Sequence, residues 1–165
     1  MGAPTNIWYS NIAAVQAGGV NILANLNDPN LDMGNVKLIT ATYTMTGNEV
    51  ANDVIYIARV PQGVIVNPVN GNIASTAIAT TATVSVGDTD TQGGTVAYDP
   101  ARYSGALNVA AGNTTVGFAF SGGTTLNTPA QIQDDWAWLV ATFATLNTPV
   151  ANKTIVFRIS LAGLD

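Results

Sequence analysis

One acidic loop comes closest to a known chemical site in this sequence. In DTDTQGGTVAYD, five residues occupy positions 1, 3, 5, 6 and 12 of a calcium-loop template: Asp88, Asp90, Gln92, Gly93 and Asp99. Hard oxygen ligands at this spacing can surround a Ca²⁺ ion. However, position 5 is Gln, position 12 is the shorter Asp, and the flanks resemble strands instead of helices. A solvated acidic hairpin loop is therefore the favoured interpretation, and we predict no metal and no cofactor.

Two adjacent carboxylates, Asp134 and Asp135, precede two tryptophans. A glycosidase needs two carboxylates on opposite sides of a sugar, roughly 5 to 9.5 Å apart. Neighbours in an extended strand point to opposite faces, so this pair cannot do that work alone. A helix N-terminus or a loop edge explains the two acids more simply.

The tryptophans, Trp136 and Trp138, are spaced i, i+2 and share one face of a predicted strand. If exposed, the two indoles could stack on sugar rings. If buried, they would serve as core or subunit-interface anchors. The apolar continuation LVATFATL favours burial.

The remaining composition excludes several functional classes. The chain has neither His nor Cys, so a Ser-His-Asp triad, thiolate chemistry and a disulfide framework are absent. We therefore predict no catalytic residues and no enzyme. The five basic residues form no stripe, which disfavours nucleic-acid binding, and no apolar run approaches the ~20 residues of a membrane helix. Arg102, between Asp99 and Tyr103, would lock a loop or form a salt bridge to a neighbouring subunit.

The elements that carry these residues follow a β pattern from residue 36 onward. In KLITATYTM (37–45), Ile39, Ala41, Tyr43 and Met45 share one face; IATTATVSV (78–86) and IVFRISL (155–161) alternate in the same way. Further strands are predicted at 53–60, 63–67, 105–110, 114–120 and 136–144. Turns are predicted at NPVNGN, GDTDTQGG, AAGNTT and SGGTTLNTP, and only TPAQIQDDW and DPARY indicate a helical turn.

These strands predict a single-domain, antiparallel, all-β sandwich of jelly-roll type at 36–165, with an extended N-terminal arm and loop at 1–35. Residues 1–27 contain no charged side chain and look too rich in Gly and Asn for a helix. They are interpreted either as a first strand with a loose tail or as an arm that lies on a neighbouring subunit. Only 9% of residues are charged, against roughly 25% in an ordinary soluble domain. Such a surface suits a protein that either belongs to an assembly or lives outside the crowded cytosol.

The stretch NDVIYIARVPQGVIVNP (52–68) predicts two apolar strands joined through a Pro-Gln-Gly turn. Its only charges are Asp53 and Arg59, and its apolar residues fall on both faces of the first strand. The second face must therefore be covered, either by edge elements of the other sheet or by a sister subunit.

Four segments of the chain resemble, in their order and residue pattern, small structural proteins of tailed-bacteriophage heads. They are NDVIYIARVPQGVIV, TATVSVGDTDT, DPARYSGAL and WAWLVATFATLNTPVANKTIVFRISL. The resemblance covers residues 36–165 and implies a decoration, or cement, protein. Such proteins are β-sandwiches, often homotrimers, that bind the major capsid protein on the outer surface of the virion head and carry no catalytic residues. The alternative hypothesis is a carbohydrate-binding or adhesin-like β-sandwich that uses Trp136 and Trp138.

Overall fold

The computed structural model describes residues 6–18, 36–91, 99–110, 112, 114–118 and 130–163. In chain order the elements are β1 (Ile7–Tyr9), α1 (Asn11–Ala17), β2 (Val36–Thr44), β3 (Val54–Pro61), β4 (Ile65–Ser75), β5 (Thr81–Asp88), β6 (Asp99–Asn108), β7 (Thr114–Gly117), β8 (Ala130–Gln131), β9 (Trp136–Asn147) and β10 (Thr154–Ala162). Among these residues no helix is long and apolar enough to cross a membrane.

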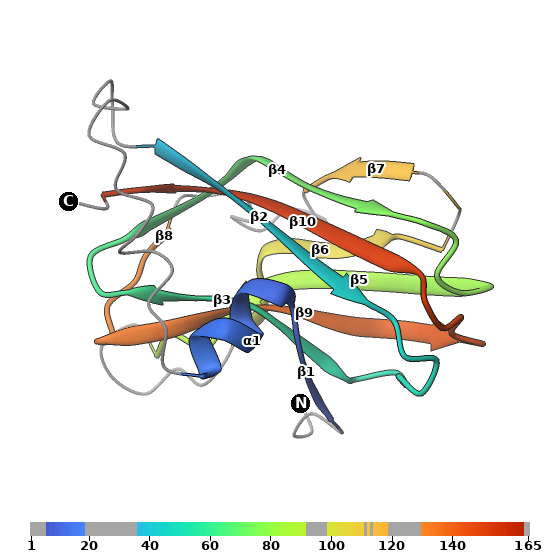
Figure 1. Cartoon of the computed structure of the whole chain (residues 1–165). Coiled ribbons are helices and arrows are strands. Elements are labelled where there is room, and N and C mark those ends of the chain that lie inside the picture. The colour runs from blue at the N-terminus through green and yellow to red at the C-terminus, as the bar shows by residue number, and fades with distance from the viewer. Residues whose placement is uncertain are drawn as a thin grey trace.

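The strands form two sheets with jelly-roll connectivity (Figure 1). One sheet has the order β1-β3-β9-β5-β6, and the other has the order β2-β10-β4-β7, with β8 paired to β4. From β2 to β5 each successive strand enters the opposite sheet, and the last strand, β10, lies between β2 and β4. This nesting of early and late strands is the double Greek-key arrangement of a jelly roll. The predicted all-β, jelly-roll-like sandwich is confirmed.

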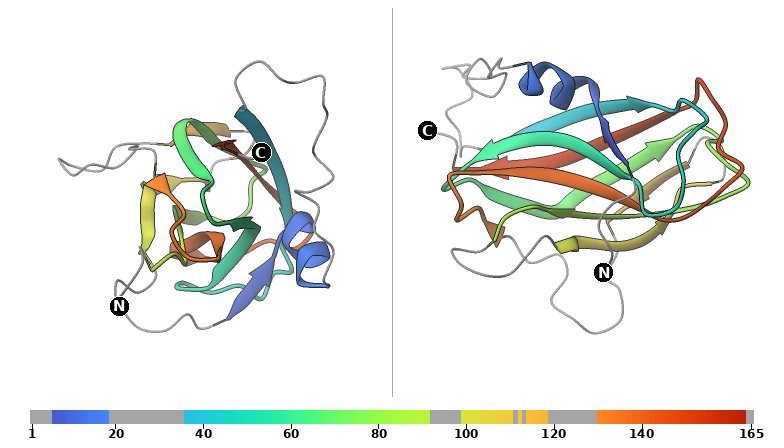
Figure 2. Two further views of the ribbon diagram at one scale, coloured as in Figure 1. Left: turned by 90° about the vertical axis from the view of Figure 1, so that its left-hand side faces the viewer. Right: turned by 90° about the horizontal axis from the view of Figure 1, so that it is seen from below.

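The core lies between the two sheets, which surround a shared interior in the end-on view of Figure 2. The predicted alternation places the inward side chains correctly. Ile39, Ala41, Tyr43 and Met45 are at most 4% exposed, and Ile155, Phe157, Ile159 and Leu161 are fully buried. Antiparallel pairing of β2 with β10 sets Ile39 opposite Ile159, so both strands present the same face to the core.

A β-bulge at Ile57 explains why β3 carries apolar residues on both faces. The pairing of β3 with β9 shifts by one residue between Tyr56 and Ala58, and Ile57 is the additional residue. The shift reverses the inward–outward alternation, so that Ile57 and Ala58 are both fully buried. The predicted Pro-Gln-Gly turn is also confirmed: it leads from β3 into β4, with Gly63 at a φ of +86° that favours glycine.

The N-terminal segment, described over residues 6–18, packs on the sandwich. Figure 1 shows its helix α1 in front of β3. β1 extends the first sheet by pairing in parallel with β3, and Ser10 Oγ accepts a hydrogen bond of 3.1 Å from Ala13 N, which caps α1. Ser10 Oγ also donates to the carbonyl of the bulge residue Ile57 at 2.5 Å. The first strand interpreted for this stretch is present as β1, whereas the short helix α1 was not predicted; the cap and the docking contacts support it. The division into 1–35 and 36–165 stays a prediction.

Three predicted turns contain strands in the structure. NPVNGN lies inside β4, where the pairing with β10 slips between Arg158 and Ser160 and accommodates the Gly and Pro as an irregularity. Gly71 is required there, since a Cβ at this position would lie 2.3 Å from the Phe118 ring. DPARY forms the start of β6, and the described part of TPAQIQDDW contains the short strand β8 instead of a helical turn. In each case pairing with neighbouring strands outweighs the local turn preference.

Candidate functional site

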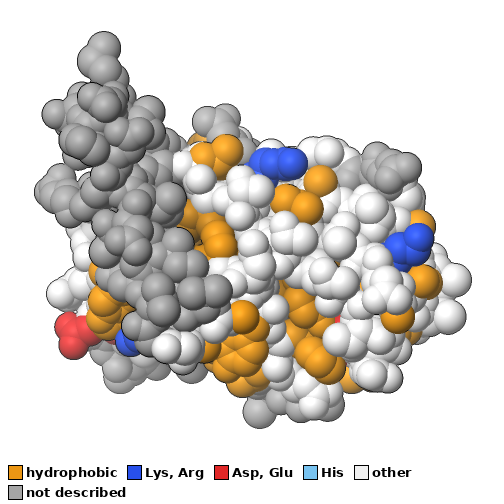
Figure 3. Space-filling model, in the orientation of Figure 1, with side chains coloured by type: hydrophobic (Ala, Val, Ile, Leu, Met, Phe, Trp, Pro, Cys, Tyr) orange, Lys and Arg blue, Asp and Glu red, His pale blue; other side chains and the backbone are white. Residues whose placement is uncertain are grey.

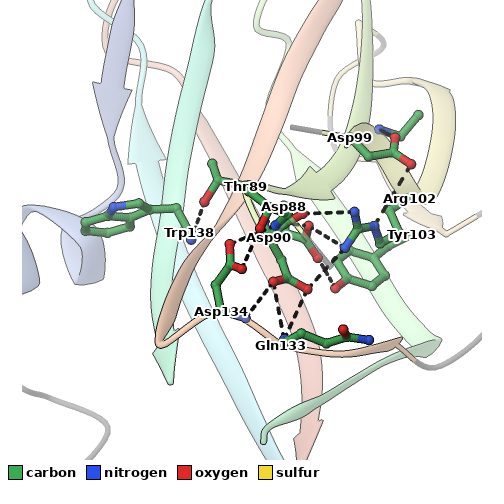
Figure 4. Close-up of polar contacts among 11 residues, drawn as sticks. Asp88, Thr89, Asp90, Asp99, Arg102, Tyr103, Gln133, Asp134 and Trp138 are labelled. Atoms are coloured by element: carbon green, nitrogen blue, oxygen red, sulfur yellow. Dashed lines mark hydrogen bonds and ion pairs between the residues drawn. The ribbon is translucent and has the colours of Figure 1, made fainter. Parts of the chain in front are cut away.

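Arg102 on β6 is surrounded by the three aspartates of the calcium-loop template (Figure 4). Its Nη1 lies 2.9 Å from Asp88 Oδ1 and 3.6 Å from Asp90 Oδ2, its Nε lies 4.0 Å from Asp99 Oδ2, and its Nη2 donates to the Asp90 carbonyl at 3.1 Å. The contact with Asp88 is an ion pair without hydrogen-bond geometry. A guanidinium of the same chain thus faces the carboxylates that a cation would need, and Arg102 locks this loop from within the chain.

The favoured interpretation of a solvated loop was wrong for two of these acids, because Asp88 and Asp90 are fully buried. The template residues Gln92 and Gly93 lie outside the described residues. Within the described part of the chain, no group of three or more His, Cys, Asp or Glu side chains is arranged to hold a metal ion.

The Asp88 carboxyl in this cluster has a raised pKa. Burial raises its pKa from 3.8 to about 6, although the hydrogen bond from the Tyr103 hydroxyl and the charge of Arg102 act in the opposite direction. Tyr103 is itself fully buried, and both burial and the adjacent negative charge of Asp88 raise the pKa of its hydroxyl. The contacts therefore form a buried polar network that joins the end of β5 to β6.

Asp90 and Asp134 fasten this network to the loop that precedes β9. Asp90 Oδ1 accepts hydrogen bonds from Asp134 N at 2.9 Å and Gln133 N at 3.2 Å. In return, Asp134 accepts from Thr91 N at 2.8 Å and from Thr91 Oγ1 at 2.6 Å. Asp135 is exposed instead, and its carbonyl oxygen accepts from Gln62 N at 3.0 Å. Asp134 and Asp135 thus have separate positions, and Asp134 holds a loop in place.

The two predicted aromatic residues have different environments on the outer face of β3 and β9. Trp138 stacks on Tyr56 with ring centroids 4.9 Å apart and an interplanar angle of 27°, and Tyr9 of β1 packs edge-on against both rings. Trp136 is 40% exposed, and the guanidinium carbon of Arg59 lies 4.7 Å from its ring centroid. The expected burial therefore holds in part for Trp138 and fails for Trp136. β1, the first strand that was one of the two interpretations of residues 1–27, supplies Tyr9, which packs on Tyr56 of β3.

Comparison with known proteins relates this fold to bacteriophage capsids. No family model matches the sequence, and no curated protein is significantly similar to it. A chain of the cyanophage Pam1 capsid asymmetric unit is 20% identical, with a TM-score of 0.57 over 78% of this chain and 85% of that chain. A chain of the capsid of Ralstonia phage GP4 is also 20% identical, with a TM-score of 0.56 over 78% of this chain and 84% of that chain. The protein shares its fold with these two phage capsid chains.

The surface of this fold carries few charges. Of the acidic residues, Glu49, Asp53, Asp88 and Asp90 are at most 1% exposed, so they add nothing to the solvent-facing charge pattern. Figure 3 shows separate hydrophobic patches among uncharged side chains on one face. Among the residues that the structure describes, the exposed large hydrophobic side chains are Ile7, Tyr9, Leu38, Val50, Ile65, Val69, Trp136 and Val150. The surface is thus suited to contacts with other proteins more than to recognition of a highly charged ligand.

A hollow of about 540 Å³ lies at one end of the sandwich, where the β3–β4 turn meets the segment after β8. It is lined by Gln62, Gly63, Gln131, Ile132 and Gln133. The sequence alone does not reveal this hollow, because its residues come from two segments about 70 positions apart. Three glutamines that follow or precede predicted strands were the only available signal.

Proposed function

We propose that this protein is a structural component of a tailed-bacteriophage virion that binds the outer surface of the head as a decoration, or cement, protein. The observation that carries the proposal is the jelly-roll fold, which 78% of the chain shares with chains of two phage capsids. Those matches extend over 84% or more of the capsid-derived chains, so the likeness concerns nearly whole domains.

The contacts of the described titratable residues support a binding role over a catalytic one. Asp88, Asp90 and Asp134 use their carboxylates to hold strands and loops together. Asp53 accepts hydrogen bonds from Trp8 and Val50 in a buried position, and Glu49 accepts several within its own loop. Carboxylates committed in this way stabilise the fold and are poorly placed to transfer protons to a substrate.

The proposed mechanism is stabilisation by preferential binding. A protein that binds the mature shell and not its dissociated or unexpanded forms lowers the free energy of the mature shell by RT ln(1 + [L]/Kd) per site. The partners are the major capsid protein and further copies of this chain, in the form of a homotrimer. Repetition of a weakly charged contact around a symmetric assembly would give high avidity from modest individual contacts.

The alternative hypothesis, a sugar-binding surface made by Trp136 and Trp138 together, receives less support. Trp138 uses one ring face to stack on Tyr56 and contacts Tyr9 as well. The two indoles therefore do not form one continuous exposed surface, although Trp136 is 40% exposed.

The proposal is tested by adding the purified protein to mature heads that lack it and to unexpanded heads as a control. We expect saturable co-sedimentation with mature heads, extra density on their outer surface by electron cryomicroscopy, and a higher temperature of DNA release. Equilibrium sedimentation should give three times the 17.0 kDa chain mass for a trimer in solution. Absence of binding to mature heads, or density confined to the tail, would contradict the proposal.

A further inference from the structure

Two fully buried carboxylates share one cation at the end of β5. Asp88 and Asp90 are both 0% exposed. The cation that faces both is the Arg102 guanidinium, whose Nη1 lies 2.9 Å from Asp88 Oδ1 and 3.6 Å from Asp90 Oδ2. With both carboxylates ionised, this buried group carries one excess negative charge. An uncompensated buried charge is costly, and uptake of one proton removes it.

The other groups around Asp88 do not offset this excess charge. Apart from Arg102, the titratable side chains that the structure describes there are acids or a neutral phenol: Asp90 after β5, Asp99 and Tyr103 on β6, and Asp134 before β9. From β9 itself, the residue opposite Asp88 is Leu139, which is apolar. Among the described elements, negative charge therefore exceeds positive charge on every side of Asp88.

The hydrogen-bond partners of Asp88 suit both of its protonation states. Its Oδ1 accepts from the backbone N of Asp90 at 3.1 Å. Its Oδ2 faces the Tyr103 hydroxyl, a group that donates to a carboxylate and can equally accept from a carboxylic acid. Burial raises the pKa of Asp88 to about 6, so this proton is exchanged close to neutral pH.

The chain segment that carries this proton site also holds the segment before β9 (Figure 4). Asp90 Oδ1 accepts from Asp134 N at 2.9 Å, and Asp134 Oδ2 accepts from Thr91 N at 2.8 Å. Gln133 N donates to the same Asp90 carboxylate at 3.2 Å, and Gln133 also lines the hollow. These four residues and Asp88 form the β5–β9 joint, whose opening would bring water to both buried carboxylates.

We propose that the β5–β9 joint is a proton-controlled latch. Proton uptake by the buried carboxylates keeps it closed, and loss of that proton lets it open while the rest of the sandwich stays folded. The reason is that ionised carboxylates are stabilised by the water that an open joint admits. The two states differ in the wall of the hollow, because Gln133 belongs to both the joint and the hollow. The latch goes beyond the proposed function and does not depend on it, since it would operate in the free protein.

Amide hydrogen exchange of the full chain, followed by NMR from pH 5 to pH 7.5, tests the latch. After correction for intrinsic exchange, the protection factors of the Asp90, Gln133 and Asp134 amides should fall about tenfold over this range. That factor follows from a pKa of about 6 in the closed state and 3.8 in the open state. At the opposite end of the sheets, the Asn152 amide, bonded to the Met45 carbonyl, should keep its protection factor. An equal fall there would overturn the proposal in favour of a general loosening.

Two substitutions locate the proton. Asp88→Asn places a neutral side chain of nearly the same shape at the site, so the three amides should keep constant protection across this pH range. Asp135→Asn, an exposed substitution in the same segment, should retain the tenfold fall. If Asp88→Asn does not fold, the carbon-13 shift of the Asp88 carboxyl in the parent protein should titrate in step with the loss of protection. Protection that is independent of pH, that falls equally in Asp88→Asn, or that falls out of step with this shift would overturn the latch.

Discussion

The indole Nε1 of Trp8 donates a hydrogen bond of 2.9 Å to Oδ2 of Asp53, a fully buried residue next to the start of β3. The same carboxylate accepts from Asn6 Nδ2 at 3.1 Å and from Val50 N at 3.0 Å. One buried negative charge thus attaches the N-terminal segment and the β2–β3 loop to the edge of the sheet. Asp53 and Trp8 are 45 positions apart, so the sequence identified the charge as unusual without naming its partner.

Replacement of Asp53 should loosen this attachment. In Asp53→Asn one carboxylate oxygen becomes an NH₂ group, which cannot accept the hydrogen bonds that converge there. We expect the free energy of unfolding to fall by about 1–3 kcal/mol in urea titrations. Asp135→Asn, at an exposed site, should change it by less than about 0.5 kcal/mol. Equal effects of the two substitutions would show that the buried carboxylate is not an anchor.

The two tryptophans of β9 should differ in their contribution to stability. Trp138→Ala removes the stack on Tyr56 and the contact with Tyr9, and we expect a loss of about 2–4 kcal/mol. Trp136→Ala removes a ring that is 40% exposed and should cost no more than about 1 kcal/mol. Chemical denaturation of both variants measures the difference, and a reversed order would contradict the assigned packing.

The raised pKa of Asp88 predicts that part of the protein's stability is lost as pH rises. Its folded-state pKa of about 6 exceeds the unfolded value of 3.8, so the folded state binds this proton more tightly. The contribution is fully present below pH 3.8 and is lost as pH rises through 6, with a total of about 3 kcal/mol. Asp88→Asn lacks this titration, so the stability advantage of the parent protein should be larger at pH 4 than at pH 7. A constant difference across that range would exclude the raised pKa.

The lowered pKa of Glu49 predicts the opposite pH dependence of stability. Burial alone would raise its pKa, but hydrogen bonds from Thr46 N at 2.6 Å and from the Tyr43 hydroxyl at 2.5 Å outweigh that effect and lower it. Its contribution is therefore present above the unfolded pKa of 4.5 and is lost as pH falls through the lowered folded value. Glu49→Gln should destabilise the protein by about 2 kcal/mol at pH 7 and by less in acid. Urea titrations at the two pH values provide the measurement.

Close packing between β5 and β6 makes Gly87 indispensable. A Cβ at this position would lie 1.8 Å from the Asp99 carbonyl oxygen, a backbone atom that cannot rotate away. Gly87→Ala should cost more than about 4 kcal/mol or prevent folding. Gly117→Ala is the matched control, since the nearest atom to its Cβ would be 4.0 Å away, and we expect a change within about 1 kcal/mol. Circular dichroism and denaturation of both variants decide the matter; a stable Gly87→Ala protein would contradict this strand packing.

Period-two alternation predicted the strands whose partners also alternate regularly. β2 and β10 pair without interruption, so Ile39 and Phe157 face the core as their spacing predicts. The prediction failed in part of β4, which pairs irregularly with β10 and whose Gly and Pro residues indicate a turn when considered locally. A neighbouring strand supplies the hydrogen bonds that make such a segment extended, and its identity is not a local property.

The candidate sites, too, could be predicted from the sequence only in part. The sequence identified Asp88, Asp90 and Arg102 as chemically unusual, and it drew attention to Trp136 and Trp138. It could not determine that Arg102 lies among the aspartates, or that Trp138 stacks on Tyr56 while Trp136 stays exposed. Those outcomes depend on which strands are adjacent and on the one-residue shift at the β3 bulge.

The sequence by itself determined the fold class, most of the strands and the low charge of the surface, because each follows from composition or from short-range alternation along the chain. Only the tertiary structure decided which acids are buried, where the N-terminal segment docks and how the hollow between Gln62 and Gln133 is assembled. The docking of the N-terminal segment and the assembly of the hollow join residues more than 40 positions apart. Their geometry is set by strand register and sheet order, which emerge when the whole chain packs around one core.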